Sequence, residues 1–166
     1  MWCFRSSVVA LAALVSACGF EPLHAPSGGA VPTVLAGIDI APIPNRLGQV
    51  VRNHLLDRLT PLGEPVFAEY RFIVSLRVAK EALAIARDDS ATRFNVSLQA
   101  DYDLVHVRSG NSVLQGEARS VAAYNVVSSD YANVVTERDA ELRAARELSD
   151  EIKTRLSVYL SQNNRS

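Results

Sequence analysis

The chain has 166 residues, of which 48% are hydrophobic and 21% are charged, and its formal net charge is −1. This composition predicts one globular domain with an ordinary hydrophobic core. The near balance of 17 basic and 18 acidic residues gives no reason to expect nucleic-acid binding. The sequence contains no CxxC, HExxH, Walker or GxSxG motif, so no motif points to a metal site, a nucleotide-binding loop or a serine hydrolase.

Residues 1–17 have the pattern of an export signal. Arg5 precedes an apolar run from Val8 to Val15, and this run is too short to span a bilayer. The next residues complete the sequence Val-Ser-Ala-Cys at positions 15–18, which resembles a lipobox. In a lipobox the cysteine receives a diacylglycerol and an N-acyl chain and becomes the mature N-terminus. We therefore predict a cleaved signal peptide over residues 1–17 and a lipid anchor on Cys18.

Cleavage leaves residues 18–166, which is 166 − 17 = 149 residues, and it removes Cys3 with the signal. The mature chain therefore has no cysteine pair for a disulfide. Residues 18–34 are rich in proline and glycine and almost uncharged, which predicts a lipidated N-terminus and a flexible tether. We predict a single domain over residues 35–161 and a frayed tail over residues 162–166.

The predicted elements begin with a short strand over residues 35–41, which ends where Pro42 follows. Asn45 is expected to cap a first helix, in which apolar residues recur at helical spacing until Leu59. Alternation from Tyr70 to Val78 predicts a half-buried strand. A shorter strand over residues 83–86 is expected to form a hairpin through the polar cluster at residues 87–90.

Two further strands and a long helix complete the domain. Residues 94–104 alternate most clearly between apolar and polar side chains and predict a strand that ends near Val107. The strand over residues 112–124 has small side chains on one face, where a helix can approach closely. Residues 128–130 offer N-cap oxygens for a helix whose apolar stripe comprises Tyr131, Val134, Val135, Leu142, Ala145, Leu148, Ile152, Leu156 and Tyr159.

These elements predict an α+β fold in the order β-α-β-β-β-β-α. Its sheet is mostly antiparallel, has four to five strands, and carries both helices packed on one face. The residues that alternate with the core positions are polar, so the other face of the sheet is expected to be polar.

A basic group is the one candidate binding feature that the residue pattern supplies. Arg87 and Arg93 flank the predicted turn, and Arg119 lies on a following strand, so a cluster suited to phosphate could form at one end of the sheet. The alternative is that Asp88, Asp89 and Glu117 neutralise these charges as ordinary surface pairs. The three histidines, His24, His54 and His106, have no acid or cysteine at ligand spacing, so no metal site is predicted.

Several segments together resemble a known family. They are CGFEPLH (18–24), LGQVVRNHL (47–55), the region from Arg87 to Phe94, YNVVSSDYA (124–132) and the following Asp139-Ala140. Their order and spacing, together with the lipobox, are similar to those of the lipopolysaccharide-assembly lipoprotein family, LptE. No single motif carries the resemblance, which extends over nearly the whole mature chain.

The resemblance implies a lipoprotein on the periplasmic side of the outer membrane that plugs the β-barrel LptD, helps it assemble and assists lipopolysaccharide transport to the surface. It implies no catalysis and no cofactor beyond the lipid on Cys18. A polar sheet face could enter the water-filled lumen of a wide barrel. Arg87 matches a basic position of the family and is the first candidate for lipopolysaccharide binding, with Arg93 second. A second basic position of the family falls near Val134 here, which leaves Arg138 as its substitute.

Two other classes of protein stay open on the sequence. A stand-alone periplasmic lipid- or ligand-binding lipoprotein needs a deep apolar cavity between sheet and helices, whereas a plug needs a filled core and a broad polar face. An anchored hydrolase needs a histidine beside a nucleophile, and the residue spacing provides none.

Overall fold

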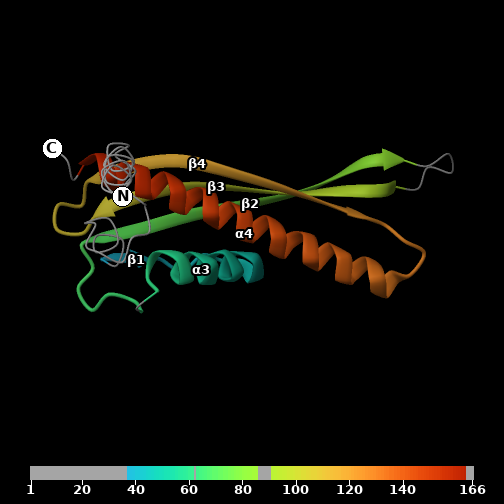
Figure 1. Ribbon diagram of the computed structural model, residues 1–166, viewed down its shortest axis with the longest axis horizontal. Coiled ribbons are helices and arrows are strands. Elements are labelled where there is room, and N and C mark those ends of the chain that lie inside the picture. The colour runs from blue at the N-terminus through green and yellow to red at the C-terminus, as the bar shows by residue number, and fades with distance from the viewer. Residues whose placement is uncertain (1–36, 62, 86–90, 164–166) are drawn as a thin grey trace, which may run out of the picture.

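The computed structural model describes residues 37–61, 63–85 and 91–163, so Cys18, the predicted tether and Arg87 lie outside the described residues. Within them, three long strands and a short one form a sheet, and two helices lie along it (Figure 1). The elements in chain order are β1 (Ile38–Ile40), α3 (Asn45–Leu59), β2 (Tyr70–Ile85), β3 (Ala91–His106), β4 (Ser112–Asn125) and α4 (Asp130–Asn163).

The sheet has the order β1-β2-β3-β4, with β1 parallel to β2 and the other neighbours antiparallel. This confirms the predicted α+β class with a mostly antiparallel sheet. The sheet has four strands because residues 83–85 continue β2 instead of forming a separate strand. The β2–β3 ladder runs from Tyr70 opposite His106 to Ile85 opposite Ala91, with irregular register only after Ala82.

Helix α3 begins differently from the expectation. Pro44 is its N-cap residue, with no side-chain cap, and Asn45 lies in the left-handed region at φ 69°, which asparagine tolerates better than most residues. Gly48 on the first turn is buried against Ile43, because a Cβ at position 48 would lie 2.8 Å from the Ile43 carbonyl oxygen. The missing side chain therefore lets the β1–α3 connection pass close to the helix.

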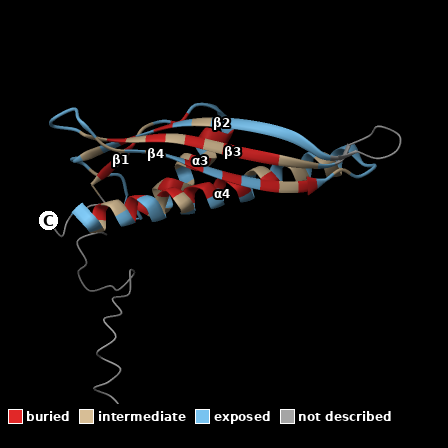
Figure 2. Ribbon diagram, turned by 90° about the horizontal axis from the view of Figure 1, so that it is seen from above, coloured by how far each residue is buried: buried red, intermediate tan, exposed pale blue. Residues whose placement is uncertain are grey.

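The core lies between one face of the sheet and the two helices (Figure 2). Small residues of β4 bring α4 close, as the pattern of that strand predicted: Ala118 and Ala122 are buried, and the Ser120 hydroxyl donates to the Ala144 carbonyl at 2.7 Å. Fully buried larger side chains fill the remaining space, and they include Phe72, Leu98, Leu104, Leu55, Leu59, Leu148, Ile152 and Leu156.

Helix α4 is much longer than α3, at about 51 Å against about 22 Å for an ideal rise of 1.5 Å per residue. Two ion pairs, Arg46 with Glu141 and Arg58 with Asp150 at 2.5 Å, place α3 beside the middle of α4. The first turns of α4 therefore have no α3 beside them. This corrects the start of the predicted apolar stripe, because Tyr131, Val134 and Val135 are exposed there. Leu142 of the same stripe is also exposed, although the neighbouring Glu141 pairs with α3.

Candidate functional site

The open face of the sheet, meaning the side of β2, β3 and β4 away from the helices, is predominantly polar. It carries alternate residues of each strand, because successive side chains point to opposite sides. Its members are Arg71, Ile73, Ser75 and Arg77 of β2, Asn95, Ser97, Gln99, Asp101 and Asp103 of β3, and Gln115, Glu117, Arg119 and Val121 of β4. The structure thus gathers on one surface the polar residues that alternate with the core positions.

Polar contacts cross the open face from strand to strand. They join Arg77 to Asp101 at 2.7 Å, Gln99 to Glu117, and Arg119 to Ser97 at 3.1 Å. Exposed contacts of this kind add little to stability, about 0–1 kcal/mol each. Their effect is on the character of the surface, which offers donors and acceptors in balanced pairs.

The two outer edges of the sheet differ in how their backbone groups are satisfied. Arginines of α4 cover the edge of β4: Arg155 donates to the Glu117 carbonyl at 2.7 Å, and Arg143 donates to the Ala123 carbonyl at 3.1 Å. On the other edge, β1 pairs only with Tyr70 to Phe72 of β2. An uncovered strand edge can pair with another chain, and the two arginines reduce that risk on β4.

We call the end of the sheet with the β2–β3 connection and the start of α4 the far end (Figure 1). There, Lys80 lies over the rings of Phe94 and Tyr124, 5.0 and 5.4 Å from their centroids, and its ammonium is 2.7 Å from Glu137. The hydrogen bond to Glu137 raises the pKa of Lys80, and the same bond lowers the pKa of Glu137. The positive charge of Lys80 is thus balanced by the carboxylate of Glu137 within the cluster. This cluster was not predicted from the sequence, where its only signal is a lysine at a core-facing position of β2.

Arg93 and Arg119, the described members of the predicted basic group, lie apart. Arg119 bonds to Ser97, whereas Arg93 lies four residues earlier on β3, about 13 Å along the strand. Arg93 is exposed at the far end, on the strand that follows the 86–90 connection. Arg87 lies outside the described residues. The phosphate-binding role of Arg87 and Arg93 therefore stays a prediction.

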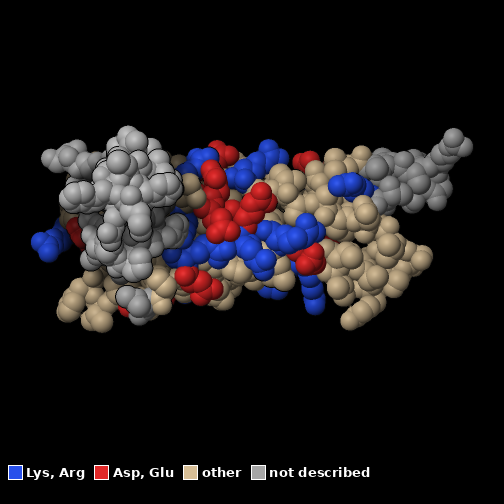
Figure 3. All heavy atoms as spheres, in the orientation of Figure 1, with Lys and Arg blue, Asp and Glu red and all other residues tan. Residues whose placement is uncertain are grey.

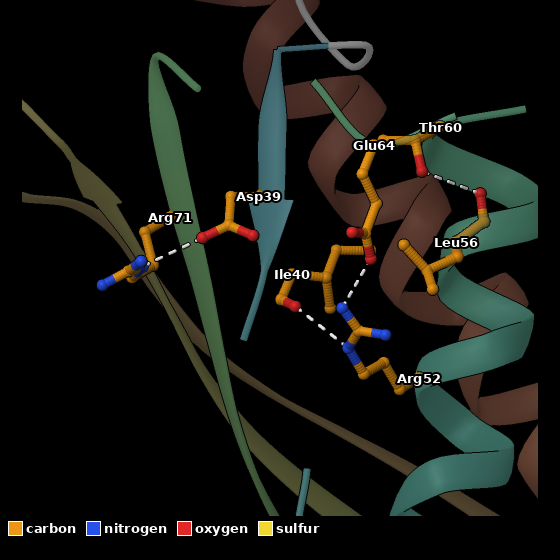
Figure 4. A network of polar contacts seen from close by, with 7 residues as sticks. All are labelled: Asp39, Ile40, Arg52, Leu56, Thr60, Glu64 and Arg71. Carbon is orange, nitrogen blue, oxygen red and sulfur yellow. Dashed lines mark hydrogen bonds and ion pairs between the residues drawn. The ribbon is translucent and has the colours of Figure 1, made fainter. Parts of the chain in front are cut away.

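The opposite end, which we call the near end, holds the start of β1, the segment 60–69 and the β3–β4 turn. Polar contacts there join α3 to β1 and to Glu64, and β2 to β1 (Figure 4). Arg52 of α3 donates to the Ile40 carbonyl at 3.1 Å and pairs with Glu64 at 2.6 Å, while Arg71 pairs with Asp39 at 3.1 Å. The segment after α3 is thereby fixed against β1.

Charged side chains of both signs gather over the middle of the molecule in the view of Figure 3, where the helices lie in front. Within α4, Arg143 pairs with Asp139 and Arg155 pairs with Glu151, each at a spacing of four residues. The helix layer therefore presents a solvated surface of mixed charge.

A family model described as LptE, lipopolysaccharide-assembly, matches residues 35–156 of the chain. The chain belongs to this family. The match spans nearly all of the described fold, from just before β1 into the last turns of α4. The chain is therefore a lipopolysaccharide-assembly lipoprotein of the LptE family, and the resemblance inferred from the sequence is confirmed.

Solved structures share the fold of this LptE-family chain. A putative lipoprotein from Caulobacter crescentus CB15 has a TM-score of 0.67 and 23% identity, with 80% of this chain and 96% of that chain covered. A minor lipoprotein from Acinetobacter baumannii has a TM-score of 0.57 and 15% identity, with 73% and 91% covered. The rare lipoprotein B from Shewanella oneidensis has a TM-score of 0.50 and 10% identity, with 76% and 95% covered. No curated protein matches the chain in sequence.

LptE-family proteins are non-enzymatic and need no cofactor. Within residues 37–61, 63–85 and 91–163, no three side chains of the metal-binding types gather. His54 is half-buried on α3, and burial, followed by the nearby Arg58, lowers its pKa. The Nδ1 atom of His106 lies 3.2 Å from the Ser109 hydroxyl. In the same part of the chain, no helix is long and apolar enough to cross a membrane.

Proposed function

We propose that this chain is an outer-membrane lipoprotein that binds and plugs an LptD-type β-barrel, aids its assembly, and assists lipopolysaccharide transport and insertion at the cell surface. The open face of the sheet carries this proposal. A wide barrel has a polar, water-filled lumen. The open face can lie against such a wall because its charges are paired side by side, as in Arg77 with Asp101, and its exposed apolar side chains are few.

The filled core favours a plug over a stand-alone lipid carrier. A carrier needs space between sheet and helices for an acyl chain or another apolar ligand. Here that space is occupied by fully buried side chains such as Leu98, Leu148 and Ile152. Every buried side-chain polar atom in the described part of the chain has a hydrogen-bond partner, so no orphaned group marks a ligand site there.

Lipid on Cys18 would hold the plug at the membrane, and Arg87 and Arg93 would contact lipid A phosphates. Arg93 lies on β3 at the far end, and Arg87 precedes it by six residues in the sequence. Guanidinium groups suit phosphate oxygens, to which they can donate two hydrogen bonds at once.

Co-purification from detergent-solubilised outer membranes tests the barrel complex. Ala79 is exposed near the centre of the open face, opposite Ser97, so Ala79→Trp adds bulk to that face without entering the core. The matched control is Gln49→Trp, at an exposed position of α3. We expect the wild-type chain and Gln49→Trp to retain a stoichiometric barrel protein and Ala79→Trp to lose it. Absence of any barrel with the wild-type chain would refute the complex, and retention by Ala79→Trp would refute the role of the open face.

Two further assays test the lipid-related parts. Arg87→Glu and Arg93→Glu are expected to weaken lipopolysaccharide binding while barrel co-purification persists, and Arg146→Glu, an exposed change on α4, is the charge-matched control. Unchanged lipopolysaccharide binding in both variants would remove the phosphate role. Radioactive palmitate labelling should disappear in Cys18→Ala, and labelling that persists would place the lipid elsewhere.

A further inference from the structure

Two adjacent apolar side chains project from the near end into solvent. Val66 is 89% exposed and Phe67 is 92% exposed, and Val107 of the neighbouring turn is 51% exposed. All three line a hollow of about 460 Å³ together with Arg71 and Arg108. We call Val66, Phe67 and Val107 the near-end patch. Single exposed apolar residues are common, but adjacent ones at a tip mark an interaction surface.

The segment that carries the patch is held at its base. Arg52 pairs with Glu64 two residues before Val66, and the Thr60 hydroxyl donates to the Leu56 carbonyl at 3.1 Å (Figure 4). After the patch, the Glu69 carbonyl accepts a hydrogen bond from Val107 N–H at 2.9 Å. These contacts join the two parts of the patch and leave its apolar side chains outside the core.

The N-terminal part of the chain enters the fold beside the patch. Glu69 N–H donates to the Gly37 carbonyl at 2.9 Å, so the first described residue lies next to the residue that bonds Val107. Cys18 precedes Gly37 by 37 − 18 = 19 residues, a length that cannot reach beyond about 65 Å in any conformation. The far end lies about 50 Å from Tyr70, at the other end of the 16 residues of β2.

The charges beside the patch suit a lipid headgroup layer without requiring an anionic one. Arg71 is paired with Asp39, and the exposed Glu69 balances the exposed Arg108 in number. The patch therefore has no net charge to repel or strongly attract a surface. Apolar tips flanked by arginines are typical of segments that lie at the boundary between headgroups and acyl chains.

We propose that the near-end patch inserts into the headgroup region of the phospholipid bilayer to which the chain is anchored. This inference rests on the proposed lipid anchor at Cys18, and it requires no barrel. The anchor makes the contact intramolecular, so a patch too small to bind a membrane from solution is held against it by high effective concentration.

The sequence offers a direct test, because Trp2 and Cys3 precede the predicted cleavage site and leave Cys18 as the only cysteine and no tryptophan in residues 18–166. The chain 18–166 is coupled through Cys18 to a maleimide lipid in phosphatidylcholine vesicles, which replaces the natural anchor. Phe67→Trp then reports on the patch. Tyr131→Trp is the matched control, since Tyr131 is 80% exposed at the far end.

We expect the emission of Phe67→Trp to shift to shorter wavelength and to lose roughly half its intensity to lipids brominated about 5–10 Å below the headgroups. Tyr131→Trp should show neither change, and added phosphatidylglycerol should alter the result little. Water-like, unquenched emission from Phe67→Trp would overturn the proposal, as would equal quenching of both variants. A blue shift that appears without vesicles and grows with protein concentration would assign the patch to a second copy of the chain instead. The barrel co-purification is independent of this assay, so either idea can fail alone.

Discussion

Replacing Gly48 by alanine tests how closely the β1–α3 connection packs against α3. The new Cβ would lie 2.7 Å from Ile43 Cγ2, 2.8 Å from the Ile43 carbonyl oxygen and 3.0 Å from its carbonyl carbon. The methyl group could rotate away, but the carbonyl is backbone, and Ile43 is itself buried. Relief therefore requires the connection or the helix to move by about half an ångström or more, given contact distances of about 3.5–4.0 Å between carbon atoms.

Two opposing effects set the sign of the change. Alanine favours helix over glycine by about 1 kcal/mol, whereas overpacking in a well-packed region costs about 1–3 kcal/mol. Because the clash is with backbone, we place Gly48→Ala towards the costly end of that range and expect a net loss of about 1–2 kcal/mol in the free energy of unfolding.

Urea unfolding of residues 18–166, followed by circular dichroism, measures this difference. The control is Asn53→Ala, at an exposed position of the same helix, which should be neutral or slightly stabilising because it changes helix propensity alone. If Gly48→Ala were as stable as the wild-type chain, the close approach of Ile43 would not be what requires a glycine there.

Three further outcomes follow from the packing and the charges. Ala118→Leu should lower the free energy of unfolding by about 1–3 kcal/mol, because Ala118 is buried under α4. Arg155→Ala uncovers the Glu117 carbonyl on the edge of β4 and should increase self-association in sedimentation velocity. Stability should fall on acidification, first around the ordinary pKa of histidine through His54 and then at lower pH through Glu137, because the folded state lowers the pKa of both groups.

The sign of the pH effect is the same for both groups. A lowered pKa means that the unfolded chain binds the proton more tightly, so stability is full above the unfolded-state pKa and is lost as pH falls. In His54→Gln the step near neutral pH should vanish and the acidic step should remain, and an unchanged profile would contradict the assignment.

For Ala118→Leu, Val121→Leu on the open face is the size control, since Val121 is exposed. Unaltered sedimentation of Arg155→Ala would show that the Glu117 carbonyl needs no cover.

The sequence predicted the elements of this fold well where burial depends on neighbouring residues alone. The period of two in β3 and the small side chains of β4 identified core-facing positions correctly, because strand geometry sends alternate residues to one side. The predicted N-cap, Asn45, was wrong, although Ser129 does accept a hydrogen bond from Ala132 N–H at the start of α4, at 3.4 Å. Local caps depend on backbone geometry that residue types only partly determine.

What the sequence could not supply depends on partners distant in the chain. The apolar residues Val134 and Val135 fit a buried stripe by spacing, yet they are exposed because α3 is too short to accompany all of α4. Lys80 finds Glu137 across 57 positions, a pairing that no local pattern records. Arg93 and Arg119 were predicted to lie near each other, but the register of β3 with β4 places them apart. The roles of Arg87 in lipopolysaccharide binding and of Cys18 in lipidation remain predictions.

Helix α4, which covers one side of the core, is the last element of the domain in chain order. Helix α4 ends at Asn163, near the C-terminus, and supplies Ala144, Leu148 and Ile152 to a core whose other wall, around Leu98 and Ala122, is complete by the end of β4. A chain cut short before α4 would hold a finished sheet with its apolar side open to water, a state prone to aggregate. The folded core therefore requires α4, and proteolytic loss of α4 should unfold the domain as a whole.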